Sequence, residues 1–399
     1  MKLITSKTHS QMATIAVAFQ AGSCLEIQKG FPFGTAHFLE HFMFKGTQKR
    51  SCFDISREVA FYGGDMNAYT SHEEVVYYIS IPYESFDKAA EILSDMIFNP
   101  RFPEDEMEKE RQVILEEYAS KFETIHGPLM QKLCQEFFSN YQQYSVIGTE
   151  ESIKQISLDD LKRFYSSFYK TENMLISVSS PGKKSDILSV IEKYFGAVDD
   201  QCSFILSPEK TRLRKNKRVS VFRAELEQAH VYSVWNSPKT GTKDSIVASV
   251  VATILGDGMD SRLFQEVREK NNLVYGIGAS HHAGRTSGGF YVSFQTRKHN
   301  LEKAEQIIES EMNKISTELV TEEELQRAKN KLKTSIYQSF TYPQGTALRK
   351  IDYYMMSKKI PTTSQLKNKV ESVTREDVMR VSAKIFSGKK LVAIGQKED

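Results

Sequence analysis

The chain has 399 residues, of which 40% are hydrophobic and 26% charged, a composition typical of a globular protein. This length exceeds one ordinary hydrophobic core and therefore predicts at least two domains. The 53 basic and 51 acidic residues leave a net charge of +2, so charge favours neither nucleic acid nor an anionic membrane as a partner.

No targeting or membrane segment is predicted. The first seven residues lack the apolar stretch and the small-residue cleavage site of a secretory signal. No apolar run approaches the ~18 residues that a membrane span requires. The four cysteines are scattered and never spaced as Cys-x-x-Cys, so neither a disulfide framework nor a cysteine zinc site is indicated. We therefore expect a cytoplasmic protein that binds neither nucleic acid nor a membrane.

Local patterns predict a mixture of strands and helices. In chain order they predict a strand at 15–19, a strand at 75–81, helices at 87–97 and 105–122, a helix from 158, and a strand at 174–178. The helix from 158 has Ser157 as its expected N-cap and Asp160 as the acid that completes a capping box. Grouped strands and grouped helices predict an α+β fold with a mixed or antiparallel sheet covered by helices.

The chain also contains a weak internal duplication. Five segments of the first half match five of the second half in the same order, at offsets of 215 to 218 residues. The matched pairs begin at residues 13 and 229, 87 and 302, 106 and 324, 158 and 375, and 174 and 390. The common order and offset predict two homologous domains of about 200 residues each.

The join between the two copies is predicted at residues 201–218. A Ser-Pro pair leads there into a basic run at 212–218, and such runs are more often solvated linkers than binding patches. The predicted organisation is therefore a first domain at 1–200, a linker at 201–218 and a second domain at 219–399.

His37, Glu40 and His41 form the pattern His-x-x-Glu-His, the inverzincin motif. On a helix, positions i, i+3 and i+4 share one face, so the three side chains point the same way. Two imidazoles one turn apart can bind one Zn²⁺, and the carboxylate between them can accept a proton from the attacking water. The competing interpretation is a pair of solvated or core histidines on an amphipathic helix.

A catalytic zinc site needs a third protein ligand, and a later segment offers two carboxylates. Glu110 and Glu117 are seven residues apart, or two helical turns, so both can face one side, whereas Glu116 lies about 100° round the helix. One carboxylate could bind the metal while the other hydrogen-bonds to a ligand or a water. Spacing alone does not decide between these roles and simple solvent exposure.

Residues 37–47 resemble the signature of the M16 (pitrilysin/insulinase) metallopeptidases. Within that family the resemblance is to subgroup M16B, which includes proteins like the mitochondrial processing peptidase. In that family a glutamate ligand follows the motif after about 76 residues. Glu117 follows His41 after 76 residues in this chain. The resemblance implies one zinc per chain and assigns these roles: His37, His41 and Glu117 as ligands, Glu40 as the catalytic base, and Glu110 as a catalytic acid beside the ligands.

Residues 63–71 resemble the edge strand on which the family binds its substrate as an added β-strand. This resemblance implies substrate binding at Asn67, Ala68 and Tyr69. A peptide bound in this way gains affinity from main-chain hydrogen bonds and must itself be extended.

Residues 263–275 resemble the Arg-x6-Tyr element of the family. The resemblance implies that Arg268 and Tyr275 are catalytic and substrate-binding residues that hold the substrate backbone and the developing oxyanion. Without it, an arginine and a tyrosine at this spacing are more often surface and packing residues.

The second copy lacks the metal residues. At the repeat offset, the positions of the motif and of the two glutamates carry Thr253, Gly256, Asp257, Ala328 and Ser335. We therefore expect a catalytic first domain and an inactive second domain that helps to enclose the substrate.

The predicted function is a zinc-dependent endopeptidase that cleaves extended, unstructured peptides. The family builds a chamber from four such domains, so a chain with two implies a dimer, most simply a homodimer. The alternative is a non-catalytic or partner-dependent M16 subunit that binds substrate peptides.

Overall fold

The computed structural model describes residues 1–196 and 216–398. The chain forms two compact units, and each is assembled from more than one stretch of sequence. Unit 1 comprises Met1–Ser120, Tyr144–Ser207 and Gln338–Ile360, and unit 2 comprises Lys121–Gln143, Pro208–Tyr337 and Pro361–Asp399. None of the described helices is both long enough and apolar enough to cross a bilayer.

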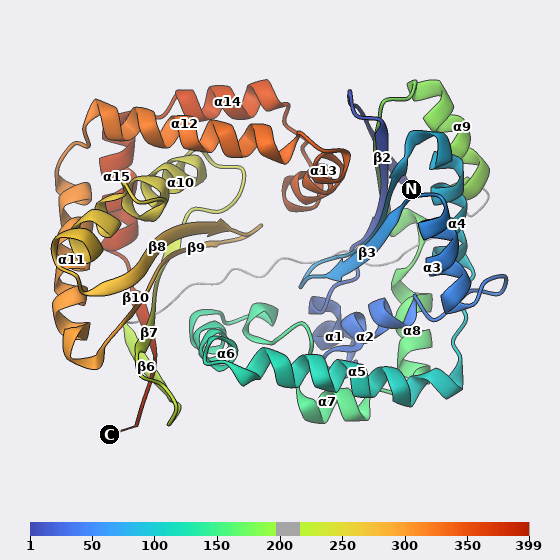
Figure 1. Ribbon diagram of the computed structural model, residues 1–399, viewed down its shortest axis with the longest axis horizontal. Coiled ribbons are helices and arrows are strands. Elements are labelled where there is room, and N and C mark those ends of the chain that lie inside the picture. The colour runs from blue at the N-terminus through green and yellow to red at the C-terminus, as the bar shows by residue number, and fades with distance from the viewer. Residues whose placement is uncertain (197–215, 399) are drawn as a thin grey trace. The chain divides into compact units, whose positions relative to one another are not determined.

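Unit 1 contains one five-stranded sheet and its covering helices (Figure 1). Its strands are β1 (Lys2–Lys7), β2 (Met12–Phe19), β3 (Asp65–Thr70), β4 (Val75–Pro82) and β5 (Met174–Ser180). Its helices are α1 (Cys24–Lys29), α2 (Thr35–Phe42), α3 (Cys52–Phe61), α4 (Phe86–Phe98), most of α5 (Glu104–Glu123), α7 (Glu150–Gln155), α8 (Leu158–Phe168), α9 (Lys184–Phe195) and α13 (Pro343–Ser357). The predicted helix from 158 is confirmed, including the capping box of Ser157 and Asp160.

The sheet of unit 1 is mixed, with the strand order β1-β5-β2-β4-β3. Strands β1 and β5 are parallel, and the other pairs are antiparallel. On one face, small residues of β2 such as Ala16 and Ala18 pack with Ile351 and Met355 of α13. Because side chains alternate along a strand, Ile15 and its odd-numbered neighbours on β2 face the opposite side. The strand β3 lies at the edge of the sheet and pairs with β4 alone.

Unit 2 repeats this architecture. Its strands are β6 (Lys217–Phe222), β7 (Ala229–Ser237), β8 (Val274–Ala283), β9 (Gly288–Thr296) and β10 (Lys390–Gln396), in the order β6-β10-β7-β9-β8. Its helices are α6 (His126–Phe137), α10 (Lys243–Gly256), α11 (Leu301–Thr317), most of α12 (Glu322–Ser339), α14 (Thr363–Glu371), α15 (Arg375–Phe386) and a π-helix, η4 (Phe264–Lys270). The predicted α+β class and internal duplication are both confirmed, because matched segments form matched elements of two identically ordered sheets.

Each unit also includes a helix from the other half of the sequence. Helix α13 belongs to unit 1, whereas α6 belongs to unit 2, where Leu129 and Leu133 are buried with Val234 and Leu391 of its sheet. The sequence patterns did not predict this exchange. The predicted linker at 201–218 lies outside the described residues as far as 215, while Lys217 and Arg218 already belong to β6.

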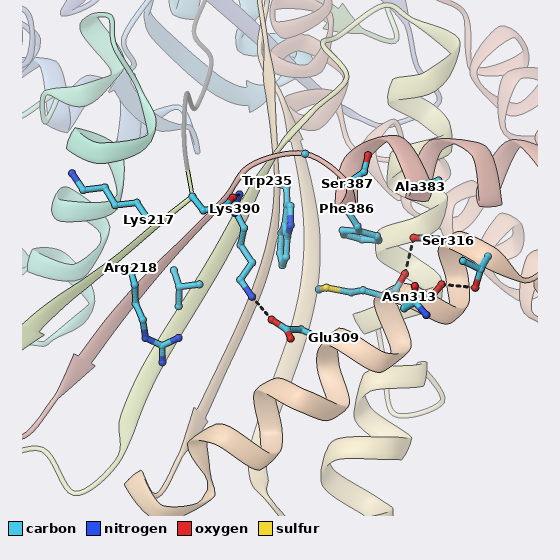
Figure 2. A pocket seen from close by; sticks show the side chains of 15 residues that line it. Lys217, Arg218, Trp235, Glu309, Asn313, Ser316, Ala383, Phe386, Ser387 and Lys390 are labelled. Atoms are coloured by element: carbon cyan, nitrogen blue, oxygen red, sulfur yellow. Dashed lines mark hydrogen bonds and ion pairs between the residues drawn. The ribbon is translucent and has the colours of Figure 1, made fainter.

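A cavity of about 770 Å³ lies in unit 2 between β6, α11 and α15 (Figure 2). Trp235 and Phe386 form part of its lining, and Lys390 extends beside the indole to an ion pair with Glu309 at 2.6 Å. In unit 1, α9 packs against β1 and α4, the counterparts of β6 and α11. The cavity thus occupies the place that α9 fills in unit 1, and the described part of unit 2 contains no matching helix.

Arg50 organises the segment that follows α2. Its guanidinium donates to Glu58 at 3.1 Å on α3, and to Glu91 and Asp95 at 2.8 Å each on α4. Thr47 donates to the same Asp95 carboxylate at 2.7 Å. Arg50 and Asp95 are both largely buried, so this network fixes the chain after α2 to two neighbouring helices.

We predict that Arg50→Met lowers the free energy of unfolding of unit 1 by about 3–5 kcal/mol, because it leaves the buried carboxylate of Asp95 without its cation. Urea unfolding followed by circular dichroism measures this loss. Arg57→Met is the matched control: Arg57 pairs with Asp54 at the surface, and such pairs contribute about 1 kcal/mol or less. Equal losses of unfolding free energy in the two variants would contradict the conclusion that Arg50 stabilises unit 1 through a buried ion pair.

Candidate metal centre

Helix α2 presents the two histidines of the motif on one face. Phe38, Leu39 and Phe42 are buried in the core of unit 1, so the remaining face carries His37 and His41. The ring centroids of the two histidines are 4.7 Å apart. The two histidines, one helical turn apart in the sequence, therefore have adjacent imidazole rings.

Helix α5 supplies a carboxylate to both imidazoles. One oxygen of Glu117 lies 3.7 Å from Nε2 of His37, and the other lies 3.5 Å from Nε2 of His41. The Glu117 side chain is half exposed, so the group opens to solvent on one side. His37, His41 and Glu117 form the one candidate metal-binding group found among the described residues.

The donor set of this group fits zinc. Two imidazole nitrogens and a carboxylate oxygen are the ligands of many catalytic zinc sites, which keep a fourth position open. Bonds of about 2.0–2.2 Å in a tetrahedron place ligand atoms about 3.3–3.5 Å apart. The His41 and His37 Nε2 atoms lie 3.5 and 3.7 Å from Glu117, each from a different carboxylate oxygen. One ligand atom from each of the three residues lies within 4.8 Å of the other two.

Glu110 fixes the orientation of His41. Its carboxylate lies 2.8 Å from Nδ1 of His41 and also forms an ion pair with Lys45. The contact turns Nε2 of His41 towards Glu117, as a carboxylate partner does for metal-binding histidines in general. Burial raises the pKa of Glu110, but hydrogen bonds from His41 and Lys45 outweigh it and leave the pKa lowered. For the cationic form of His41 burial has the opposite effect and lowers the pKa. Hydrogen bonds to Glu110 and Glu117 outweigh burial and raise the pKa of His41 to about 9.

Glu40 is buried beside these groups and has a partner that the sequence did not reveal. The hydroxyl of Thr70, at the end of β3, donates to Glu40 Oε2 at 2.6 Å. Burial raises the pKa of Glu40, while the Thr70 hydroxyl and the charge of His41 lower it. The contact orients one carboxylate oxygen and ties α2 to the edge strand.

Asn67, Ala68 and Tyr69 lie in the middle of β3, at the edge of the sheet. Burial raises the pKa of Tyr69 far above its usual value, and the charges of Glu74 and Asp352 raise it further. The three residues are thus next to Thr70, whose hydroxyl contacts Glu40.

Arg268 and Tyr275 lie together in unit 2. Arg268 belongs to the π-helix η4, and its guanidinium lies 4.5 Å from the ring centroid of Phe264 and 5.2 Å from that of Tyr275. Tyr275 is 80% exposed. Single turns of π-helix are rare and often accompany functional sites. Phe264 was not singled out from the sequence, although its aromatic ring four residues before Arg268 is the signal that could have identified it.

Comparison with known proteins identifies the family. Residues 2–150 match the profile "Insulinase (Peptidase family M16)", and residues 155–332 match "Peptidase M16 inactive domain". An "Uncharacterized zinc protease" of Rickettsia felis is 30% identical over 361 residues, covering 89% of this chain and 85% of the relative. The chain belongs to peptidase family M16. A relative from Bacillus subtilis, "Uncharacterized zinc protease YmxG", is 28% identical over 356 residues, covering 89% of this chain and 86% of that protein.

Solved structures share the fold of this M16 chain. The crystal structure of a protease from Helicobacter pylori matches with a TM-score of 0.91 and 20% identity, covering 98% of this chain and 96% of that one. A structure from Pseudomonas fluorescens described as a peptidase M16 inactive domain matches with a TM-score of 0.88 and 17% identity, covering 100% of this chain and 95% of that one. At these identities the likeness is one of fold.

We predict that His41→Ala and Glu117→Gln each lower zinc affinity by more than about 100-fold. His41→Ala removes a donor atom, and Glu117→Gln replaces an anionic carboxylate oxygen with a neutral, weaker amide oxygen. Either change to a direct ligand should cost more than the ~10–100-fold typical of losing a ligand's hydrogen-bond partner. Competition with a chromogenic chelator measures the dissociation constant. Glu116→Gln, an exposed neighbour on the same helix, is the control and should keep the parental value. Parental zinc affinity in the Glu117 variant would exclude it as a ligand.

Proposed function

We propose that this chain is a zinc-dependent endopeptidase of the M16B subgroup, with His37, His41 and Glu117 as zinc ligands. The observation that carries the proposal is the approach of both Nε2 atoms to one carboxylate of α5. The naming of its relatives as zinc proteases supports the same reaction class.

Glu40 is the proposed general base. When bound, zinc supplies Lewis acidity towards water and the peptide carbonyl. Glu40 then takes the proton of the attacking water and returns it to the leaving amine. Burial raises the pKa of Glu40 above its usual value, which makes the carboxylate a stronger base, and the hydrogen bond from Thr70 keeps one carboxylate oxygen in place. Glu110 holds the His41 ring through Nδ1.

The proposed substrates are extended, unstructured peptides. Strand β3 has a free edge in the described sheet, and it ends at Thr70, the residue bonded to Glu40. A peptide added along Asn67, Ala68 and Tyr69 gains main-chain hydrogen bonds without any requirement for its side chains. Most segments of a folded protein already have their main-chain groups paired, so the proposal limits the enzyme to flexible segments.

We further propose a homodimeric chamber in which Arg268 and Tyr275 of one subunit act on the peptide held by the other. The chain carries two homologous units, and the candidate metal group found among residues 1–196 and 216–398 lies in unit 1. The stacked guanidinium and the exposed phenol offer donors suited to a substrate carbonyl or an oxyanion.

Glu40→Gln should retain one zinc per chain but lose most of its turnover, because an amide cannot accept the proton of water. General acid–base catalysis contributes about 10²–10⁴-fold to the rate, so kcat should fall by at least about 100-fold. Cleavage of a mixed peptide library, followed by mass spectrometry, measures activity alongside metal analysis. Near-normal kcat would mean that another group is the base, and absence of activity in the zinc-loaded parent would favour a non-catalytic subunit.

Mixing two inactive variants tests the shared site. Glu40→Gln and Arg268→Ala chains, combined under conditions of subunit exchange, should regain part of the activity, because one mixed site joins an intact Glu40 with an intact Arg268. A site completed within one chain predicts no recovery, since each chain then carries its own defect. Exchange is verified separately with labelled chains. Confirmed exchange without recovery would exclude the shared arrangement.

A further inference from the structure

Glu26 is a carboxylate in the core of unit 1 to which the proposed chemistry assigns no role. It lies on α1 and is only 1% exposed. Its Oε2 accepts from the backbone N–H of Gly34 at 3.0 Å, and its Oε1 accepts from that of Ala36 at 2.8 Å. Its main-chain oxygen accepts from Phe31 N at 2.9 Å. One residue thus holds the loop before α2 and the first turn of that helix.

The first turn of α2 cannot supply this cap from its own N-cap position. The first N–H groups of a helix lack partners within the helix, and Ser, Thr, Asp or Asn at the N-cap usually accepts from one of them. Here the N-cap is Gly34, at φ 93°. A Cβ at Gly34 would lie 2.5 Å from the carbonyl oxygen of Ile147, so a residue with a side chain does not fit. Glu26 supplies from another helix the acceptor that the N-cap lacks.

The carboxyl group of Glu26 is costly to bury. Burial raises its pKa to about 8, although the N–H groups of Ala36 and Gly34 lower it. An apolar side chain would fill the same volume without that desolvation cost, but it would leave two buried N–H groups without an acceptor.

Helix α1 is in turn fixed to the turn after β3. The N–H groups of Ser23 and Cys24 donate to the carbonyls of Ser71 at 3.2 Å and His72 at 2.8 Å. The backbone at Gly22 lies so close to His72 that a Cβ would meet it at 2.5 Å. These bonds connect the end of the edge strand to α1, and Glu26 connects α1 to α2.

The bond from Thr70 to Glu40 closes this path. The chain of hydrogen bonds runs from the end of β3 to α1, and from Glu26 on α1 to α2. The bond between Glu40 on α2 and Thr70 returns it to β3. His37 follows Ala36 directly, so the first turn that Glu26 holds is also the turn that carries the first proposed ligand.

We propose that Glu26 is a positioning residue that sets the first turn of α2, and with it His37 and His41, relative to the edge strand β3. This role rests on the proposed zinc site. Loss of either acceptor oxygen lets the first turn shift, which moves Nε2 of His37 away from the other donors.

The test compares Glu26→Gln with the parent chain. The amide keeps the volume but turns an N–H₂ group towards a backbone N–H. Zinc affinity, measured by chelator competition, should fall by about 10-fold or more, as for other groups that orient ligands. The visible absorption of the Co²⁺-substituted protein should change in intensity, because it reports the geometry of the ligands.

Ser51→Ala is the matched control. Ser51 is the N-cap of α3, which carries none of the proposed ligands, so its loss should lower the melting temperature but leave zinc affinity and the Co²⁺ spectrum at parental values. Parental zinc affinity and spectrum in Glu26→Gln would overturn the positioning role and leave the zinc site intact. A parent chain that binds no zinc would overturn the proposed function itself, and this role with it. If Glu26→Gln does not fold, Glu26→Asp, which retracts the carboxylate by one methylene, must show the same losses, and parental values there would overturn the proposal.

Discussion

Two imidazoles one turn apart on α2 face a carboxylate on α5, and the candidate metal site of unit 1 depends on this arrangement. A helix fixes the spacing of His37 and His41 but not their direction relative to a third donor. The packing of α5 brings Glu117 to both Nε2 atoms, and Glu110, two turns earlier, holds the far side of the His41 ring. The same two helices therefore supply the candidate ligands and the group that orients one of them.

Helix α2 is held at both ends by buried polar groups. Glu26 bonds to its first turn, and Arg50 anchors the segment that follows it through Asp95 and Thr47. Burying polar or ionic groups costs desolvation free energy that apolar replacements of equal volume avoid. The presence of such groups at the two ends of one short helix is consistent with a requirement for position rather than for stability. Residues that touch neither metal nor peptide can therefore matter to this site as much as those that do.

Unit 2 shows that the same sheet order does not carry the same chemistry. It preserves the strand order of unit 1, but Thr253, Gly256 and Asp257 stand at the repeat positions of the metal motif. Its distinctive features are the π-helix with the stacked Arg268 and the cavity where unit 1 holds α9. Function in this chain belongs to side chains placed on a repeated scaffold, as is general for widely used folds.

The sequence by itself determined what depends on local periodicity. Helical spacing placed His37 and His41 on one face and Glu110 and Glu117 on another, and turn chemistry marked Ser157 as a cap, because these relations need only one helix and its first turn. The tertiary structure alone decided which elements meet. It brought Thr70 to Glu40 across 30 residues, placed α6 and α13 in opposite units, and gave Glu26 the N–H groups of α2. No periodicity encodes such contacts, since they arise from chain packing rather than from the geometry of one element.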